Sequence, residues 1–294
     1  MSKYAIFLGC TTPTRVPQYE LSARWIFKRF GIDLIDIEDF VCCGANQINI
    51  SMETGLLLAA MNLALAEVQD LDIVTLCPWC FTALAAGVEE LRKQEVRGRV
   101  NKQLSTIGLE YNGRTRVKHI SRVLYEDIGL DRIKEGARRD LSKIQVAPHY
   151  GCRYLKPQWA SEGFDEPNDP KTLHQLISAI GATAIDYETL NLCCGGKVFP
   201  VSEDLAHSLI AKKLDNLQDK EVDCMVLLCQ TCYLMYATQQ EKVSKKFNKQ
   251  YNIPVVLYLQ LLGLAMGADP VADLGLNLNV PSVDRVLAKI GNDV

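Results

Sequence analysis

The segment VCCGAN, residues 41–46, is repeated in altered form as LCCGGK, residues 192–197. Each segment lies between further cysteines, with gaps of 31 and 33 residues in the first copy and of 40 and 34 residues in the second. The patterned cysteines are Cys10, Cys42, Cys43, Cys77 and Cys80, then Cys152, Cys193, Cys194, Cys229 and Cys232. One unit with five cysteines therefore occurs twice in the chain.

The fifth cysteine of each copy limits the chemistry. A structural zinc site or an ordinary cubane iron–sulfur cluster is complete with four thiolates. Cys77-x-x-Cys80 and Cys229-x-x-Cys232 also fit a thioredoxin-type dithiol, in which a helix N-terminus lowers the pKa of a thiol. That interpretation leaves six patterned cysteines unexplained. The pattern therefore favours an unusual metal cluster in each half.

Composition narrows the class of protein. The chain has 294 residues, of which 48% are hydrophobic, enough for a sizeable core and about two domains. Formal net charge is -3, with scattered basic residues, so we expect no nucleic-acid partner. The apolar N-terminal run is too short for a signal peptide and no other run is long enough to span a membrane, so we expect a cytoplasmic protein.

Eleven cysteines in a reducing compartment are better explained as metal ligands or catalytic groups than as disulfides. The one cysteine outside the two copies is Cys224, within the apolar run DCMVLLC. We expect a buried, inert thiol at this position.

Apolar periodicity predicts alternating strands and helices in both halves. Expected strands cover residues 4–8, 33–37, 73–76, 144–147, 183–186 and 224–228, and expected helices cover 54–68, 81–91, 171–180, 203–217 and a segment from 231 onward. This order predicts an α/β fold of two similar, pseudo-repeated lobes, each with a small, mainly parallel sheet flanked by helices. We expect a first lobe over residues 1–140, including a charged connection from about residue 90, and a second lobe over residues 141–294.

The cysteines fall at functional positions of such a fold. Cys10, Cys77, Cys152 and Cys229 each follow an expected strand, and ligand sites of open α/β sheets lie at the carboxyl ends of strands. Gly44 and Gly195 would permit the tight backbone that two adjacent ligands require. Five sulfur atoms are thus expected to converge in each lobe, and the clusters are expected at the lobe interface.

These motifs together resemble the B subunits of heterodisulfide reductases, a family with two Cys-Cys-Gly (CCG) domains. The resemblance covers residues 4–260 and includes GCTTP at 9–13, HYGCR at 149–153, CPWC at 77–80 and CQTC at 229–232. It implies that each set of five cysteines holds a noncubane 4Fe-4S cluster, made of two fused 2Fe-2S units with one bridging cysteine. It also implies a two-electron reduction of the coenzyme M–coenzyme B heterodisulfide, bound between the clusters, in methanogenic energy metabolism.

The resemblance implies partner proteins too. The chain has neither a dinucleotide fingerprint nor a ferredoxin-type cysteine run, so we expect no flavin or NAD and an external electron source. In the family, electrons come through a ferredoxin-like C subunit from a flavin-bearing, bifurcating A subunit, and ultimately from hydrogenase or formate dehydrogenase. We expect an exposed apolar docking patch, for which the segment 255–294 is one candidate.

Four further residues are candidates for the reaction. His149, three residues before Cys152, is a candidate proton donor, although a histidine that only bonds backbone is the simpler interpretation. Arg153 and Lys197, with Lys156, are candidates for binding the phosphate and sulfonate groups of the substrate. His119, His174 and His207 are expected at the surface or with satisfied hydrogen bonds. Ser282 is expected to cap a helix over 283–290.

Two other functions stay open. A different CCG-domain iron–sulfur protein would have the same motifs, and would reduce another disulfide or pass electrons to a quinone. A non-catalytic scaffold would hold zinc or ordinary cubane clusters and would show no response to substrate.

Overall fold

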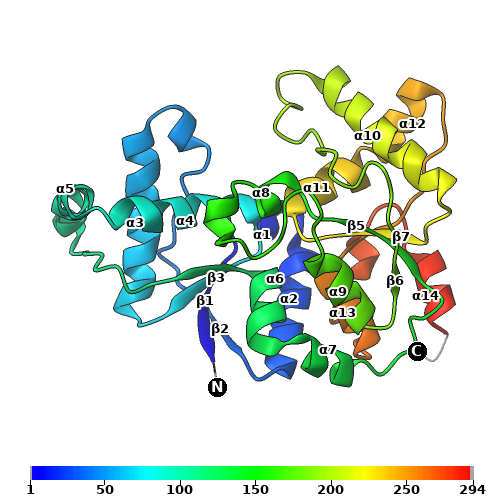
Figure 1. Ribbon diagram of the computed structural model, residues 1–294, viewed down its shortest axis with the longest axis horizontal. Helices are drawn as coiled ribbons and strands as arrows, with labels where there is room; N and C mark the ends of the chain where they lie inside the picture. Colours follow the sequence, from blue (N-terminus) through cyan, green and yellow to red (C-terminus); the bar gives the residue numbers. More distant parts are fainter. Residues whose placement is uncertain (1, 292–294) are drawn as a thin grey trace.

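The computed structural model describes residues 2–291, and its two halves contain the same arrangement of strands (Figure 1). The first half has a four-stranded sheet in the order β2-β1-β3-β4, and the second has one in the order β6-β5-β7-β8. Every pairing between these strands is parallel. The strands are β1 (Lys3–Phe7), β2 (Asp33–Ile35), β3 (Asp72–Thr75), β4 (Val117–His119), β5 (Gln145–His149), β6 (Thr183–Ala184), β7 (Cys224–Leu227) and β8 (Val255–Leu257). The expected fold class, two pseudo-repeated α/β lobes, is confirmed.

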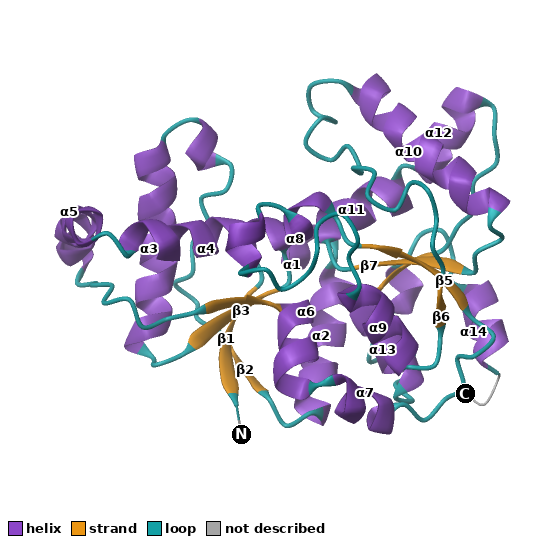
Figure 2. Cartoon of the chain, viewed as in Figure 1, coloured by secondary structure: helices purple, strands orange, loops and turns teal. Residues whose placement is uncertain are grey.

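Helices cover both sheets and connect the parallel strands (Figure 2). They are α1 (Thr11–Arg15), α2 (Pro17–Arg29), α3 (Met52–Val68), α4 (Pro78–Leu91), α5 (Gln94–Leu104), α6 (Ile120–Arg122), α7 (Leu130–Gly136), α8 (Cys152–Leu155), α9 (Thr172–Ala179), α10 (Glu203–Asp219), α11 (Gln230–Tyr233), α12 (Gln240–Phe247), α13 (Tyr258–Ala265) and α14 (Asp284–Ile290). Among residues 2–291 there is no helix long and apolar enough to cross a bilayer.

A serine cap in each lobe fixes where the helix after the CCG loop begins. The Oγ atom of Ser51 accepts a hydrogen bond from the backbone N–H of Thr54 at 3.2 Å, and Ser202 does the same for Leu205 at 3.3 Å. Ser51 and Ser202 lie at matching distances from their Cys-Cys pairs. The same local signal therefore ends both CCG loops.

The edge strands β4 and β8 were not expected. Each has three residues, too few for a recognisable alternation of apolar and polar side chains, and each is identified only by its pairing with β3 or β7. The segment predicted to be a connection between lobes therefore completes the first sheet, and it also contains α5.

The expectation that the segment 255–294 serves as a docking surface is wrong for its first part. All residues of β8 and α13 are buried, because they pack within the second lobe and against α2 of the first. The last helix, α14, begins two residues after Ser282, whose Oγ accepts a hydrogen bond from the N–H of Asp284 at 3.1 Å.

The two lobes share a hydrophobic core. One buried cluster lies only in the first lobe, between its sheet and helices α3, α4 and α5, whereas a larger cluster runs from α2 through α13 into the second lobe. Tyr19 of α2 is fully buried, and its hydroxyl donates to the carbonyl of Leu228 at 3.0 Å. The two lobes are thus joined through a continuous buried cluster and this hydrogen bond.

Candidate metal-cluster and substrate site

The cysteines lie at the carboxyl ends of the central strands, as the sequence predicts. Cys10 and Cys152 are three residues beyond the ends of β1 and β5, and Cys77 and Cys229 are two residues beyond β3 and β7. Cys77 and Cys229 are also the N-cap residues of α4 and α11. A thiolate there faces the positive end of a helix dipole, which favours ligands in their deprotonated form.

The glycines of the CCG loops have the conformation that two adjacent ligands require. Gly44 has a φ of 81° and Gly195 a φ of 77°, in the left-handed region. A Cβ atom at Gly44 would lie 2.5 Å from the carbonyl oxygen of Gly55. Only glycine fits at this position, where the CCG loop crosses α3.

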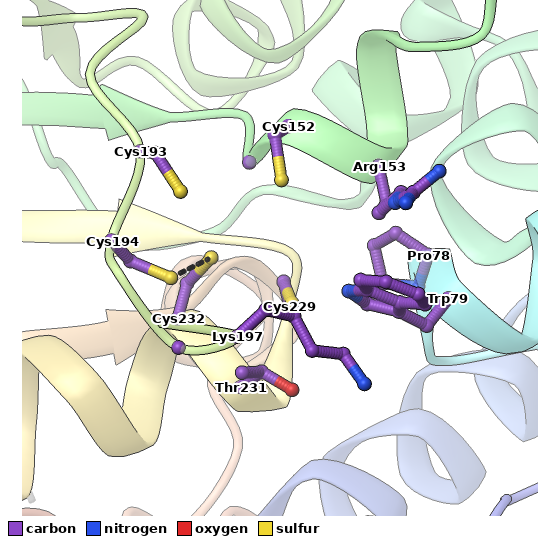
Figure 3. Close-up of a pocket in the computed structure, with 12 residues that line it drawn as sticks. Pro78, Trp79, Cys152, Arg153, Cys193, Cys194, Lys197, Cys229, Thr231 and Cys232 are labelled. Atoms are coloured by element: carbon purple, nitrogen blue, oxygen red, sulfur yellow. Dashed lines mark hydrogen bonds between the residues drawn. The ribbon is translucent and has the colours of Figure 1, made fainter. Parts of the chain in front are cut away.

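All five cysteines of the second set line a single cavity of about 180 Å³ (Figure 3). Their side chains come from α8, the CCG loop and the start of α11, and their sulfur atoms point toward a common space. The Sγ atoms of Cys194 and Cys232 are 3.5 Å apart. Five thiols around one space fit a polynuclear group bound by soft ligands.

The thiols of the second set share negative charge. A hydrogen bond with Cys152 lowers the pKa of Cys193 and raises the pKa of Cys152. The pKa of Cys229 is also lowered, chiefly by the thiol of Cys232 and then by backbone N–H groups of α11. Neighbouring thiols raise the pKa of Cys152, Cys194 and Cys232, so Cys193 and Cys229 are the members of the set that most readily form thiolates, the metal-binding form of cysteine.

The thiols of the first set also interact with one another. A hydrogen bond with Cys80 lowers the pKa of Cys43 to about 7, and Cys77 also bonds Cys80. Cys42 interacts with Cys43 and with Cys10. Cys10 and Cys42 are exposed, and both line an open groove. Cys152 and Cys193 are likewise exposed in the second set, so each set has two exposed and three buried thiols.

Neither set resembles a site for one ion. Across the described part of the chain, no three histidine, cysteine or acidic side chains are arranged to hold a single metal ion. The second set instead surrounds a volume, and soft sulfur ligands suit iron–sulfur clusters.

A tryptophan of the first lobe covers the cavity of the second. Trp79, from the CPWC motif, lies beside two cations: the Arg153 guanidinium is 4.1 Å from its ring centre and the Lys197 ammonium is 4.0 Å away (Figure 3). Lys197 also donates a hydrogen bond to Asn46, which belongs to the first CCG loop. The lobe interface therefore forms one wall of the site.

The structure places Arg153 and Lys197 on the wall of this cavity, as expected for residues that would bind an anionic substrate. Lys156 is exposed and lines a neighbouring cavity of about 90 Å³, which shares Gly151 and Cys152 with the first. Binding by Arg153 and Lys197 stays a prediction.

His149 lies behind the thiols and not in the cavity. It is 2% exposed, and burial lowers its pKa well below the usual value, so the ring is neutral at pH 7. Its Nδ1 atom is 3.2 Å from the Nζ atom of Lys213, and its buried Nε2 atom has no hydrogen-bond partner among the described residues. His149 does line the neighbouring cavity of about 90 Å³, together with Cys152. A role as proton donor stays a prediction.

Lys213 was not among the functional residues predicted from the sequence. This lysine of α10 is fully buried, and its Nζ atom donates to the carbonyl of Leu190 at 2.9 Å. Burial lowers its pKa to about 7, although nearby Cys232, Cys194 and Cys193 oppose the shift. The sequence could have indicated a buried lysine here, because Lys213 falls on the apolar face of α10 with Ile210 and Leu214.

The remaining candidate residues lie outside the cavity. His119 is buried rather than at the surface; its Nδ1 atom bonds the hydroxyl of Ser121 at 2.8 Å, but its Nε2 atom has no partner within residues 2–291. His174 bonds the hydroxyl of Tyr150 at 2.7 Å. Cys224 is fully buried, and burial raises the pKa of its thiol to about 12, in agreement with an inert role.

The fold and the two sets of five thiols define a two-lobed, cysteine-rich protein. A family model described as "Cysteine-rich domain" (CCG) matches twice, over residues 4–85 and 146–237. Each match spans β1 to α4 or β5 to α11, and so includes one complete set of cysteines.

Similar proteins make the assignment more specific. The B subunit of the ferredoxin:CoB-CoM heterodisulfide reductase of Methanosarcina mazei is 35% identical over 99% of this chain and 97% of its own length. A protein of Archaeoglobus profundus, named as similar to the B subunit of heterodisulfide reductase, is 34% identical over 94% of each chain. The 8-methylmenaquinol:fumarate reductase membrane anchor subunit of Wolinella succinogenes is 30% identical over 95% of this chain and 96% of its own. The chain belongs to the family of heterodisulfide reductase B subunits, which are CCG-domain oxidoreductases.

A solved structure shares the fold. A hypothetical protein from Helicobacter pylori superposes with a TM-score of 0.78 and 17% sequence identity, over 96% of this chain and 52% of that one. At this identity the likeness concerns the fold alone.

Proposed function

We propose that this chain is the catalytic subunit of a heterodisulfide reductase, and that it reduces the coenzyme M–coenzyme B heterodisulfide to two thiols. The observation that carries the proposal is the single cavity that combines five thiols with Arg153 and Lys197. The reaction consumes two electrons and two protons and breaks one S–S bond. Relatives named as heterodisulfide reductase subunits match nearly the whole chain, which supports the same reaction here.

We propose a noncubane 4Fe-4S cluster in each set of five cysteines. Bound there, the two clusters would supply the electrons and offer iron, for which thiolate sulfur has a high affinity. The chain itself contributes the thiolate ligands, and its CCG glycines bring two of them together in each lobe. Each set offers one thiol more than the four that an ordinary cubane cluster would use.

The protein's cations would orient the substrate. Arg153 and Lys197 contact the ring of Trp79 and line the cavity, where an anionic group could bind to them. A planar guanidinium suits a phosphate or sulfonate through paired hydrogen bonds. The indole excludes water on the side of the cavity that faces the first lobe.

We keep His149 as the candidate for proton delivery, with Lys213 behind it. When the Lys213 ammonium donates to the Nδ1 atom of His149, the imidazole carries its own proton on the Nε2 atom. That N–H, which has no hydrogen-bond partner in the described part of the protein, is the group able to pass a proton on.

Electrons would come from partner proteins. We propose a ferredoxin-like C subunit as the direct donor, with a flavin-bearing, bifurcating A subunit upstream of it that is fed by hydrogenase or formate dehydrogenase, in the cytoplasm. Three relatives of this chain are themselves named as subunits of reductases. An apolar groove of about 1080 Å³ lies between α3, α4 and α5, with exposed Met52 and Trp159 on its wall. This groove replaces the buried segment 255–265 as the candidate docking patch.

The test is the iron, sulfide and zinc content of anaerobically purified protein, followed by reduction of the coenzyme M–coenzyme B heterodisulfide with a reduced viologen dye. About eight irons per chain, as two 4Fe-4S clusters require, and heterodisulfide-dependent dye oxidation are expected. A paramagnetic signal that depends on added coenzyme M under oxidising conditions would show that the thiol reaches iron. Zinc in either set, or no activity with eight irons present, would overturn the proposal.

A second candidate function is electron transfer to or from a quinone. The Wolinella relative, named as a menaquinol:fumarate reductase subunit, favours it. Oxidation of a menaquinol analogue by iron-loaded protein that is inactive on the heterodisulfide would establish this alternative.

A further inference from the structure

The internal repeat allows the surroundings of the two cysteine sets to be compared position by position. Lys213 lies 19 residues after Cys194, and the residue 19 after Cys43 is Asn62. His149 lies three residues before Cys152, and the residue three before Cys10 is a phenylalanine. The backbones correspond, but the chemistry differs: a buried amine and an imidazole in the second lobe replace an amide and a phenyl ring in the first.

The partners of Lys213 lie on segments that carry cysteines of the second set. The Nζ atom is 2.9 Å from the carbonyl of Leu190, three residues before Cys193, and 3.2 Å from His149, three residues before Cys152. It also lies 5.7 Å from the ring centre of Tyr236, four residues after Cys232. The ammonium is thus placed at the rear of the second set, shielded from water.

The matching position of the first set has no charge. Asn62 accepts a hydrogen bond from the N–H of Val41 at 2.9 Å and donates to the carbonyl of Cys42 at 3.2 Å. Its neutral amide therefore holds the CCG loop in place and adds no charge. An acidic residue, Asp36, lines the groove with Cys42 and pairs with Arg24 at 2.6 Å. In the second lobe the position of Asp36, six residues before the CCG pair, is taken by Tyr187.

We propose that Lys213 makes the two cluster sites electrostatically unequal, so that a cluster held by the second set accepts an electron more readily than one held by the first. This inference rests on the proposed function only in requiring that both sets bind clusters. A reduced cluster has one more negative charge, which favours the ammonium form of Lys213. A buried ammonium stabilises that charge more strongly than an exposed one, because little water screens it. Arg153 and Lys197 also contact Trp79 and Asn46 of the first lobe, so Lys213 is the cation that distinguishes the two sets.

The experiment first measures the two potentials separately. Cys43→Ser protein should retain the second cluster and Cys194→Ser protein the first, and each is titrated electrochemically while paramagnetic resonance is recorded. The second cluster is expected to be the easier to reduce, by on the order of tenfold in the reduction equilibrium constant, which is about 59 mV. Equal potentials, or the opposite order, would overturn the inference.

The role of Lys213 is then tested by Lys213→Met and Lys213→Gln, with Lys212→Met as the matched control, because the neighbouring Lys212 is exposed on the same helix. Both Lys213 variants should lose roughly tenfold in the reduction equilibrium constant of the second cluster and leave the first unchanged. Lys212→Met should alter neither. Unchanged potentials in Lys213→Met protein with full iron content would refute the role of this lysine.

Iron content separates this inference from the proposed function. Wild-type protein without two clusters would contradict the proposed function itself, whereas two clusters of equal potential would contradict only the inequality. If the Lys213 variants lose iron, the comparison of Cys43→Ser with Cys194→Ser still decides whether the sites are unequal.

Discussion

At the scale of single residues, the two sets of cysteines differ sharply from the eleventh. The ten patterned thiols lie on loops at strand ends or at the first turn of the helices that follow, whereas Cys224 lies inside β7 with no exposed surface. The type of residue alone does not separate a ligand from a core side chain. Its position relative to the strand ends does.

Replacing one ligand should remove one cluster only. In Cys43→Ser or Cys194→Ser protein, we expect about half of the iron to be lost and heterodisulfide reduction to be abolished, because serine is a poor ligand for iron in place of thiolate. Iron analysis and the viologen assay measure both effects. Cys224→Ser protein should keep its full iron content; retention of all iron in both ligand variants would contradict the assignment.

Removing a cation from the cavity should weaken substrate binding more than catalysis. We expect Lys197→Met and Arg153→Met to raise the KM for the heterodisulfide by about 10- to 100-fold with a smaller effect on kcat, because a charge-assisted hydrogen bond is lost. Lys156→Met, in a different cavity, is the matched control. An equal rise in KM for all three variants would show that only overall charge matters.

His119 should make the protein sensitive to acid. Burial lowers its pKa to about 3, below the value of about 6.5 in an unfolded chain, so protonation favours unfolding. Stability should therefore fall as the pH drops below 6.5, by at most about 1.4 kcal/mol per pH unit down to the folded pKa. Urea unfolding of His119→Phe between pH 7 and 4 should show a shallower decline than wild type. Parallel curves would mean that this histidine contributes nothing to acid unfolding.

At the scale of elements, periodicity identified the long helices and the buried central strands. The helices α3 and α10 and the strands β3 and β7 lie within two residues of their expected bounds. The edge strands β4 and β8 were missed, because three residues in a strand leave no pattern and only pairing with a neighbour defines them. The burial of α13 was missed as well, because its packing partner α2 lies more than 200 residues away in the sequence.

The CCG loop should not tolerate a side chain at its glycine. Gly44→Ala would place a Cβ atom 2.5 Å from the carbonyl oxygen of Gly55 and strain a φ of 81°. We expect a loss of at least about 2 kcal/mol in the free energy of unfolding, with loss of iron from the first set.

The control for this variant is Gly98→Ala. Gly98 lies within α5, and a Cβ atom there would meet nothing within 4 Å. Alanine should therefore leave stability unchanged or raise it by about 0.5–1 kcal/mol. Chemical denaturation of both variants measures the difference, and equal stabilities would show that the loop relaxes freely.

At the scale of the whole molecule, the lobes are alike in topology but share one core. Residues of α2 and α13 pack together, and Tyr19 bonds the carbonyl of Leu228 in the other lobe. A boundary near residue 140 separates the two sheets in sequence but cuts through this shared hydrophobic cluster.

Fragments 1–140 and 141–294 should therefore not fold stably by themselves. Each would expose apolar surface that the other lobe covers in the full chain, and such surface drives most of folding. Circular dichroism should show one cooperative thermal transition for the intact protein and none, or a much lower Tm, for each fragment. Two fragments that melt as sharply as the whole would show that the lobes are independent domains.

The sequence by itself determined the duplicated unit, the class of fold, and the ten patterned cysteines, four of them directly after strands, because spacing and apolar periodicity are local properties of the chain. Only the tertiary structure decided which side chains surround each set. Trp79 meets Arg153 and Lys197 across the lobe interface, and Lys213 meets His149 between α10 and β5. These contacts join residues more than sixty positions apart. The contacts of Trp79 exist because the two lobes pack together, and that of Lys213 exists because α10 and β5 meet in the interior of the second lobe.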